Sequence, residues 1–177
     1  ITTLKKFALV VEIDDAVLIY YSGHGSFVED QGYLVPSNGQ IDSLNSLLPT
    51  STLLEYCEKL PAKHVFLIID MCFAGTFLNE QITPLHKEGK TIQLLLAGTH
   101  QQRVPDRSVF AHLVREGLRG FAANKKHGEI TASELMLYTK TMIGKYTLDQ
   151  QVLDIYLVRD RGGEELAFQW IQPYLPY

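Results

Sequence analysis

The stretch that decides the fold is His64-Val-Phe-Leu-Ile-Ile-Asp70-Met-Cys72-Phe-Ala-Gly75. Its apolar run is continuous over residues 65–69 and rich in β-branched side chains, which is typical of a strand buried on both faces of a parallel sheet. The run stops at a carboxylate, Asp70, and a thiol, Cys72. Ligands and reacting groups of open α/β sheets collect beyond the carboxyl ends of the strands. Asp70 and Cys72 therefore lie where chemistry is expected.

A second stretch upstream has the same design. Ala16-Val-Leu-Ile-Tyr-Tyr21 reads as a buried strand, and Ser22-Gly-His24-Gly25 follows it directly. The alternation of strands with helical segments favours a parallel pairing of the two strands. We therefore expect His24 and Cys72 to leave the same edge of the sheet, which would bring a base to a thiol.

The two motifs together resemble a known family. Tyr20-Tyr-Ser-Gly-His-Gly25 and Asp70-Met-Cys-Phe-Ala-Gly75 are similar to the caspase-like cysteine peptidases, with metacaspases and their bacterial relatives nearest. Caspases place the histidine about 50 residues before the cysteine, as this chain does. Further similar segments follow in family order at residues 32–36, 94–102, 108–120 and 129–135.

The resemblance implies the caspase-like three-layer α/β fold, in which a mostly parallel central sheet carries helices on both faces. Caspase-like domains begin with a strand and a helix before the segment that corresponds to Ile1. We therefore expect an N-terminal strand to be missing from this chain, and a regulatory domain or segment to lie outside it. At 177 residues and 46% hydrophobic, the chain suits one core rather than two. We predict a single catalytic domain over residues 1–177, with a large-subunit-like part (1–80) and a small-subunit-like part (81–177).

Composition narrows the classes of partner. The net charge of −4 argues against nucleic acid or an anionic membrane, and no apolar run is long enough to span a bilayer. Cys57 and Cys72 are the two cysteines, so the chain is not a disulfide scaffold. A reducing, cytoplasmic setting suits a thiol that must stay reduced. The expected partner is a protein or peptide substrate.

Periodicity and capping signals predict the remaining elements. A helix from Thr2 or Thr3 turns Leu4, Phe7, Ala8 and Val11 inward and ends before Asp14. Capping boxes predict helices that begin at Thr52, with Glu55, and at Thr131, with Glu134, and that end at Pro61 and Gly144. The other expected elements are a short strand at 32–36 after the His24 loop, a strand at 91–97, a helix capped by Ser108 and ended by Gly120, and a hairpin of residues 152–158 with 165–170.

The residue types suit nucleophilic catalysis. A free thiol has a pKa of about 8.5 and is mostly protonated at neutral pH, so a neighbouring imidazole is needed to make it a thiolate. We expect Cys72 to be the nucleophile and His24 the general acid and base. The resemblance assigns the backbone N–H groups of Gly25 and Cys72 to the oxyanion hole. Without such a partner, Cys72 would read as a buried structural thiol, as we expect for Cys57.

Asp70 has two interpretations. It can line the pocket for the residue before the scissile bond and favour Arg or Lys, as the metacaspase resemblance implies. It can equally accept backbone N–H bonds in its own turn. The loop at residues 100–102 lacks the acidic residue that relatives often carry there. Cleavage after Asp therefore remains the alternative specificity.

Regulation is expected by resemblance alone. Relatives are zymogens cut in the linker that corresponds to residues 80–90. We do not expect calcium at the turn at 121–128, since two lysines stand where relatives have oxygen donors, and we predict no metal site or cofactor. Calcium activation through another site stays open. A catalytically silent caspase-like scaffold or regulatory module is the alternative from another class.

Overall fold

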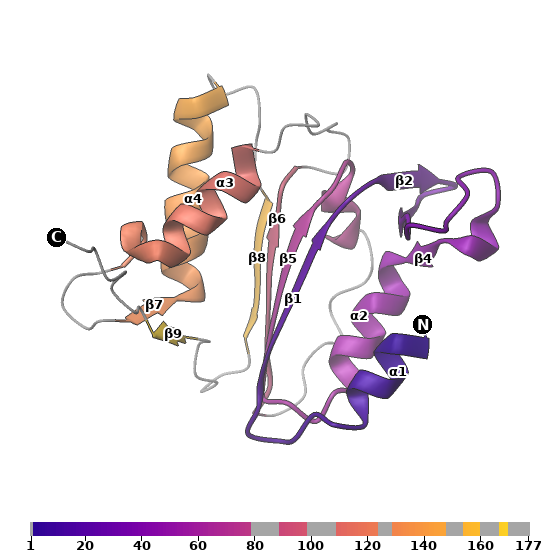
Figure 1. Ribbon diagram of the computed structural model, residues 1–177, viewed down its shortest axis with the longest axis horizontal. Helices are drawn as coiled ribbons and strands as arrows, with labels where there is room; N and C mark the ends of the chain where they lie inside the picture. The colour runs from indigo at the N-terminus through magenta and orange to yellow at the C-terminus, as the bar shows by residue number, and fades with distance from the viewer. Residues whose placement is uncertain are drawn as a thin grey trace, which may run out of the picture.

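A computed structural model of the chain describes residues 2–78, 89–98, 109–123, 129–147, 154–159 and 167–169. Within them, a four-stranded sheet lies between two pairs of helices, and a smaller sheet extends from one corner (Figure 1). The predicted three-layer α/β architecture is confirmed.

The central sheet has the strand order β1-β5-β6-β8. Strands β1 (Ala16–Ser22), β5 (His64–Asp70) and β6 (Thr91–Leu96) are parallel, and β8 (Asp154–Arg159) is antiparallel to β6. Strand β6 is buried along its whole length and β5 everywhere except at its first residue, which explains the apolar run at 65–69. In β6 the polar residues Thr91 and Gln93 are buried as well. The prediction of a buried strand at 16–21 was wrong in its burial. Strand β1 lies at an edge of the described sheet, and its Leu18 and Tyr20 are 43% and 47% exposed.

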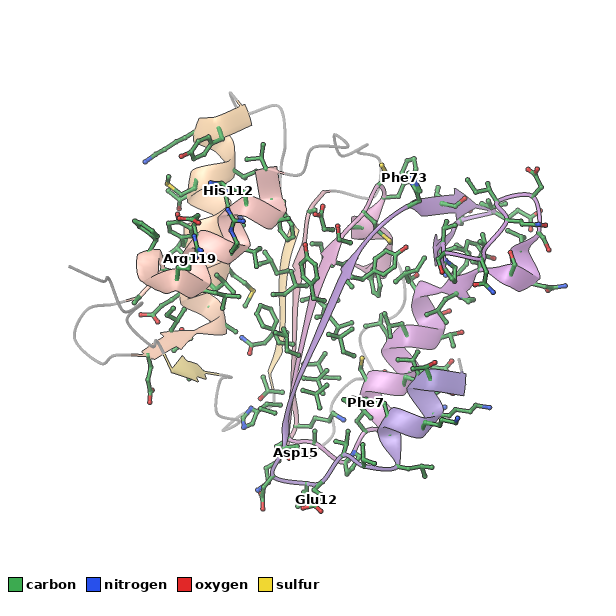
Figure 2. All side chains as sticks on the ribbon, viewed as in Figure 1. Phe7, Glu12, Asp15, Phe73, His112 and Arg119 are labelled. Carbon is green, nitrogen blue, oxygen red and sulfur yellow. The ribbon has the colours of Figure 1, made fainter. Side chains whose placement is uncertain are left out.

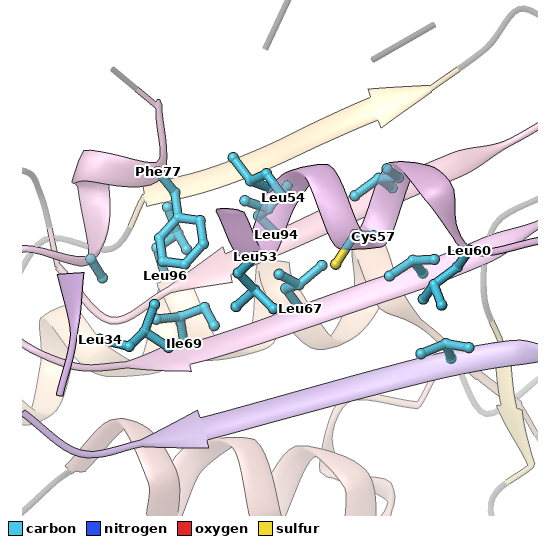
Figure 3. Close-up of a cluster of buried hydrophobic side chains, with 14 of the residues drawn as sticks. Leu34, Leu53, Leu54, Cys57, Leu60, Leu67, Ile69, Phe77, Leu94 and Leu96 are labelled. Atoms are coloured by element: carbon cyan, nitrogen blue, oxygen red, sulfur yellow. The ribbon is translucent and has the colours of Figure 1, made fainter. Parts of the chain in front are cut away.

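Helices cover both faces of this sheet (Figure 1). On one side lie α1 (Thr2–Ala8) and α2 (Thr50–Lys59), and on the other lie α3 (Val109–Glu116) and α4 (Ala132–Thr147). Successive strand residues point to opposite faces. Leu67 and Ile69 of β5 therefore join the α2 core, where they surround Cys57 and Phe77 (Figure 3). Phe66 and Ile68 join the α3 and α4 core.

The first helix is shorter than predicted. It ends at Ala8, and two turns follow, in which Leu9 N donates to Lys6 O and Val10 N to Phe7 O. Leu4, Ala8 and Val11 pack against the core as expected. The inward placement of Phe7 was wrong, since this residue is 42% exposed.

A hairpin follows β1 directly. Strand β2 (Gly25–Val28) pairs antiparallel with β3 (Gln31–Leu34), which pairs with β4 (Leu48–Pro49) after the short 3-10 helix η1 (Leu44–Ser46). A short strand was predicted at 32–36, which overlaps β3, whereas the segment of β2 was predicted to be a loop. The two turn residues, Glu29 and Asp30, both have positive φ, as the tight turn of a two-residue hairpin requires.

One of the two capping boxes is present. Thr131 Oγ1 accepts from Glu134 N at 3.1 Å, and Thr131 N donates to Glu134 Oε2 at 2.9 Å, so α4 begins as predicted. The Thr52 box was wrong, because α2 already begins at Thr50 after Pro49 and has no side-chain cap. Helix α4 also continues past Gly144 to Thr147.

Two further predictions concern the C-terminal half. Helix α3 leads into the π-helical segment η3 (Gly117–Phe121), where Gly120 has a φ of 110°, as expected of a glycine that ends a helix. The predicted C-terminal hairpin was wrong. Strand β8 pairs with β6, and β9 (Ala167–Gln169) pairs with β7 (Glu129–Thr131). Both segments do form strands, but each has a partner distant in sequence.

Candidate active site

The register of β1 and β5 brings the two motifs together. The strands are parallel, and their last residues, Ser22 and Asp70, are paired. His24 and Cys72 each stand two residues beyond this pair. Gly23 N also donates to Asp70 O at 3.1 Å, which carries the ladder one step past the strand ends. The predicted meeting of the two motifs at one edge of the sheet is therefore confirmed for the backbone.

The two loops touch directly at Gly25. A Cβ atom at this position would overlap the carbonyl oxygen of Cys72 and would lie 3.1 Å from the side chain of Met71. Only a glycine allows the chain after His24 to approach the cysteine loop this closely. The second glycine of the Ser-Gly-His-Gly motif is therefore required by packing.

Tyr21 holds the histidine loop from inside. Its hydroxyl lies 2.9 Å from the carbonyl oxygen of His24 and 3.0 Å from that of Val35, so it can donate to either. Val35 N donates to His24 O at 3.0 Å. A side chain at Gly23 would meet the Tyr21 hydroxyl at 2.7 Å. Burial raises the pKa of Tyr21, which therefore stays protonated and able to donate. His24 is exposed and Cys72 is half-buried, so both are open to a ligand.

The residue after the cysteine has an unusual backbone. Phe73 has a φ of 60°, the left-handed region, which bulky residues adopt at a cost of about 1–3 kcal/mol and mostly at functional sites. Its ring stacks on Phe27 of β2, with 6.4 Å between centroids and an interplanar angle of 28°. Figure 2 shows Phe73 at the end of the sheet where β2 begins. An aromatic contact therefore also joins the two motifs.

Asp70 is 4% exposed, although it closes a strand at the edge of the sheet. Ser22 Oγ donates to Asp70 Oδ2 at 3.4 Å. Burial, and after it the Asp70 charge, raise the pKa of Tyr20, while a hydrogen bond from Ser22 lowers it. The negative field of Asp70 thus reaches a half-exposed phenol on β1. Ser22 and Tyr20 were not predicted as site residues, although the alternation of side chains along β1 places both on one face.

The two cysteines have opposite environments. Cys57 is fully buried in the α2 core, and burial raises the pKa of its thiol to about 12 (Figure 3). The expected structural role of Cys57 is confirmed. Cys72 is therefore the accessible thiol of the pair.

Several expected regions lie outside the described residues. They are most of the linker at 80–90, the polar loop at 100–102 and the end of the turn at 121–128. In the ranges that the structure covers, no three His, Cys, Asp or Glu side chains are grouped to hold a metal ion. No helix within those ranges is long and apolar enough to cross a membrane.

A sequence model of the caspase domain, peptidase C14, matches residues 1–151. The chain belongs to the caspase domain family. No curated protein matches the chain. A caspase domain is in general that of a cysteine peptidase, and the parallel sheet flanked by helices agrees with this membership. The resemblance of the two motifs to the caspase-like cysteine peptidases is thus confirmed.

Proposed function

We propose that the chain is a cysteine endopeptidase that uses a Cys72–His24 dyad and cleaves after Arg or Lys. The observation that carries the proposal is the paired ending of β1 and β5, which delivers an exposed imidazole and an accessible thiol to one edge of the sheet. The steric closeness of Gly25 to Cys72 supports it.

In the proposed reaction, His24 takes the thiol proton of Cys72, and the sulfur attacks the scissile carbonyl carbon. A C–S bond forms, and the π electrons of the carbonyl move to its oxygen. When the tetrahedral intermediate collapses, the C–N bond breaks and His24 gives its proton to the leaving amine. Water, deprotonated by His24, then attacks the thioester, which releases the acid and restores the thiol.

The oxyanion needs N–H donors, and the proposed ones belong to Gly25 and Cys72. Because Val35 N donates to His24 O, Gly25 and Leu34 form a non-hydrogen-bonded pair of the β2–β3 ladder. The Gly25 N–H therefore points away from β3. That direction supports its role as a donor, and such a donor typically contributes about 3 kcal/mol to transition-state stabilisation.

Asp70 is the proposed pocket acid. Its carboxylate is buried beside the nucleophile loop, and it shares a hydrogen bond with Ser22 at the edge of the sheet. A carboxylate removed from bulk water favours a cationic side chain and disfavours an anionic one. The proposal therefore predicts basic specificity and disfavours cleavage after Asp.

Fluorogenic peptides ending in Arg, Lys or Asp test the function with wild-type chain, Cys72→Ala and Asp70→Asn. We expect hydrolysis after Arg or Lys that Cys72→Ala abolishes. Asp70→Asn nearly preserves the shape of the side chain and should reduce kcat/KM on basic peptides by about a hundredfold. Basic selectivity that survives Asp70→Asn would return Asp70 to its role in the turn.

Activation as a zymogen, by a cut in residues 80–90, is proposed on the family resemblance. Mass spectrometry of the incubated chain, with and without calcium, should show two fragments for wild type and none for Cys72→Ala. An intact chain that still hydrolyses peptides would contradict the zymogen. If the chain hydrolyses no peptide and Cys72 does not react with peptidyl electrophiles, the alternative of a catalytically silent scaffold is favoured.

A further inference from the structure

The left-handed conformation of Phe73 links its side chain to the nucleophile. The angle φ of Phe73 sets the rotation of the peptide plane that carries the Cys72 carbonyl. That carbonyl oxygen abuts Gly25, immediately after His24. If Phe73 relaxed to negative φ, the peptide plane would rotate and the spacing between the cysteine and histidine loops would change.

The chain on either side of Phe73 is anchored. Asp70 and Met71 are buried before it, and Ala74 and Phe77 of η2 (Ala74–Leu78) are fully buried after it. A strained residue between two fixed segments persists only when its surroundings over-determine it. A contact that can hold its side chain is the stacked ring of Phe27.

Phe27 is well placed for this purpose. It lies on β2, two residues after Gly25, and it is paired with Gly32 in a hairpin closed by a tight turn. The same strand therefore begins beside His24 and holds the ring that meets Phe73. Movement of one motif relative to the other would have to break the stacked pair.

We propose that Phe27 is a positioning residue: its ring holds Phe73 in the left-handed conformation and thereby sets the position of Cys72 relative to His24. The inference rests on the proposed dyad and deepens it. Phe27 acts through Phe73 and does not itself take part in the chemistry.

Alkylation of the full chain by iodoacetamide across a pH series tests this, since the reagent needs neither a substrate nor a processed enzyme. Buried Cys57, with a pKa of about 12, stays silent, and Cys72→Ala provides the blank. We expect Phe27→Leu to lower the rate of Cys72 alkylation at neutral pH by about tenfold or more. Phe27→Tyr keeps the ring and should restore the wild-type profile.

A second experiment uses Phe73→Gly to test whether Phe27 acts through the Phe73 side chain. Glycine adopts positive φ without a side chain to hold it there. If Phe27 acts through Phe73, then Phe27→Leu should have little further effect in the Phe73→Gly background. Circular dichroism of each variant verifies that the compared chains are folded, and the Phe27→Tyr and Phe73→Gly comparison serves if Phe27→Leu does not fold.

The outcomes separate the two proposals. If the alkylation rate depends on His24 and Phe27→Leu leaves it unchanged, this inference alone is overturned. The same holds if Phe27→Leu lowers the rate equally in the wild-type and Phe73→Gly backgrounds. If Phe27→Leu does not fold, a tenfold loss of reactivity in a folded Phe27→Tyr overturns it, because that variant keeps the ring. A wild-type profile that His24→Ala does not alter overturns the dyad and this inference together.

Discussion

Ser22 and Asp70 end two parallel strands as a register pair, and Ser22 Oγ donates to Asp70 Oδ2 at 3.4 Å. This pair defines the base of the candidate site. One step beyond it, Gly23 N donates to Asp70 O, and two steps beyond it stand His24 and Cys72. The register of the two strands therefore sets the position of the site. Beyond the strand ends, the two loops are held together by the close approach at Gly25 and by the stacked Phe27–Phe73 pair.

Gly25→Ala should inactivate the proposed peptidase. Its Cβ would overlap the Cys72 carbonyl and force the two loops apart, and we expect kcat/KM to fall by about a hundredfold or more. Gly89→Ala is the matched control. Gly89 has a φ of 78°, and a Cβ there meets no atom within 4 Å, so that variant should lose some stability and keep its activity. Equal activity losses in both variants would contradict the steric argument.

Tyr21→Phe should lower kcat and leave KM nearly unchanged. The variant keeps the ring but removes the hydroxyl that bonds the His24 and Val35 carbonyls, at a cost of about 1 kcal/mol in the free energy of unfolding. Steady-state kinetics and urea unfolding measure the two effects. Tyr146→Phe, at an exposed position of α4, should change neither. A Tyr21→Phe enzyme with wild-type kcat would show that the hydroxyl only stabilises the fold.

Cys57 should make the fold sensitive to alkali. Burial raises its pKa to about 12, above the value of about 8.5 for a free thiol, so its contribution is fully present below about pH 8.5. As pH rises from 9 toward 12, the unfolded chain loses the proton first, and the free energy of unfolding should fall by about 1.4 kcal/mol per pH unit from this group. Urea unfolding of wild type and Cys57→Ala over that range measures the difference in slope. Equal slopes would mean that Cys57 is not buried as the structure has it.

Thr131→Ala should destabilise the fold by about 1 kcal/mol, because Thr131 Oγ1 accepts from Glu134 N at the start of α4. The matched control is Thr52→Ala. Thr52 lies inside α2, where alanine is the better helix former, so the free energy of unfolding should stay the same or rise slightly. Urea midpoints compare the two, and a larger loss at Thr52 would contradict the observed start of α2.

Local patterns predicted what local physics controls. The strands β1, β5 and β6, the reciprocal cap of Thr131 and Glu134 and the helix end at Gly120 were predicted correctly. Two failures have different causes. The capping pattern at Thr52 was wrong because α2 already begins at Thr50, after Pro49. The C-terminal hairpin was wrong because β8 pairs with the distant β6, and the choice of a strand's partner depends on the packing of the whole sheet.

By itself, the sequence determined the fold class and the two motifs, because buried parallel strands need continuous apolar runs and the chemistry needs a particular thiol and imidazole. Only the tertiary structure decided the contacts that hold them in place: the Ser22–Asp70 pair, the Tyr21 hydroxyl on the Val35 carbonyl, and the ring of Phe27 on the left-handed Phe73. These contacts join residues of separate segments or depend on a backbone angle. No periodicity or spacing along one stretch of chain encodes them.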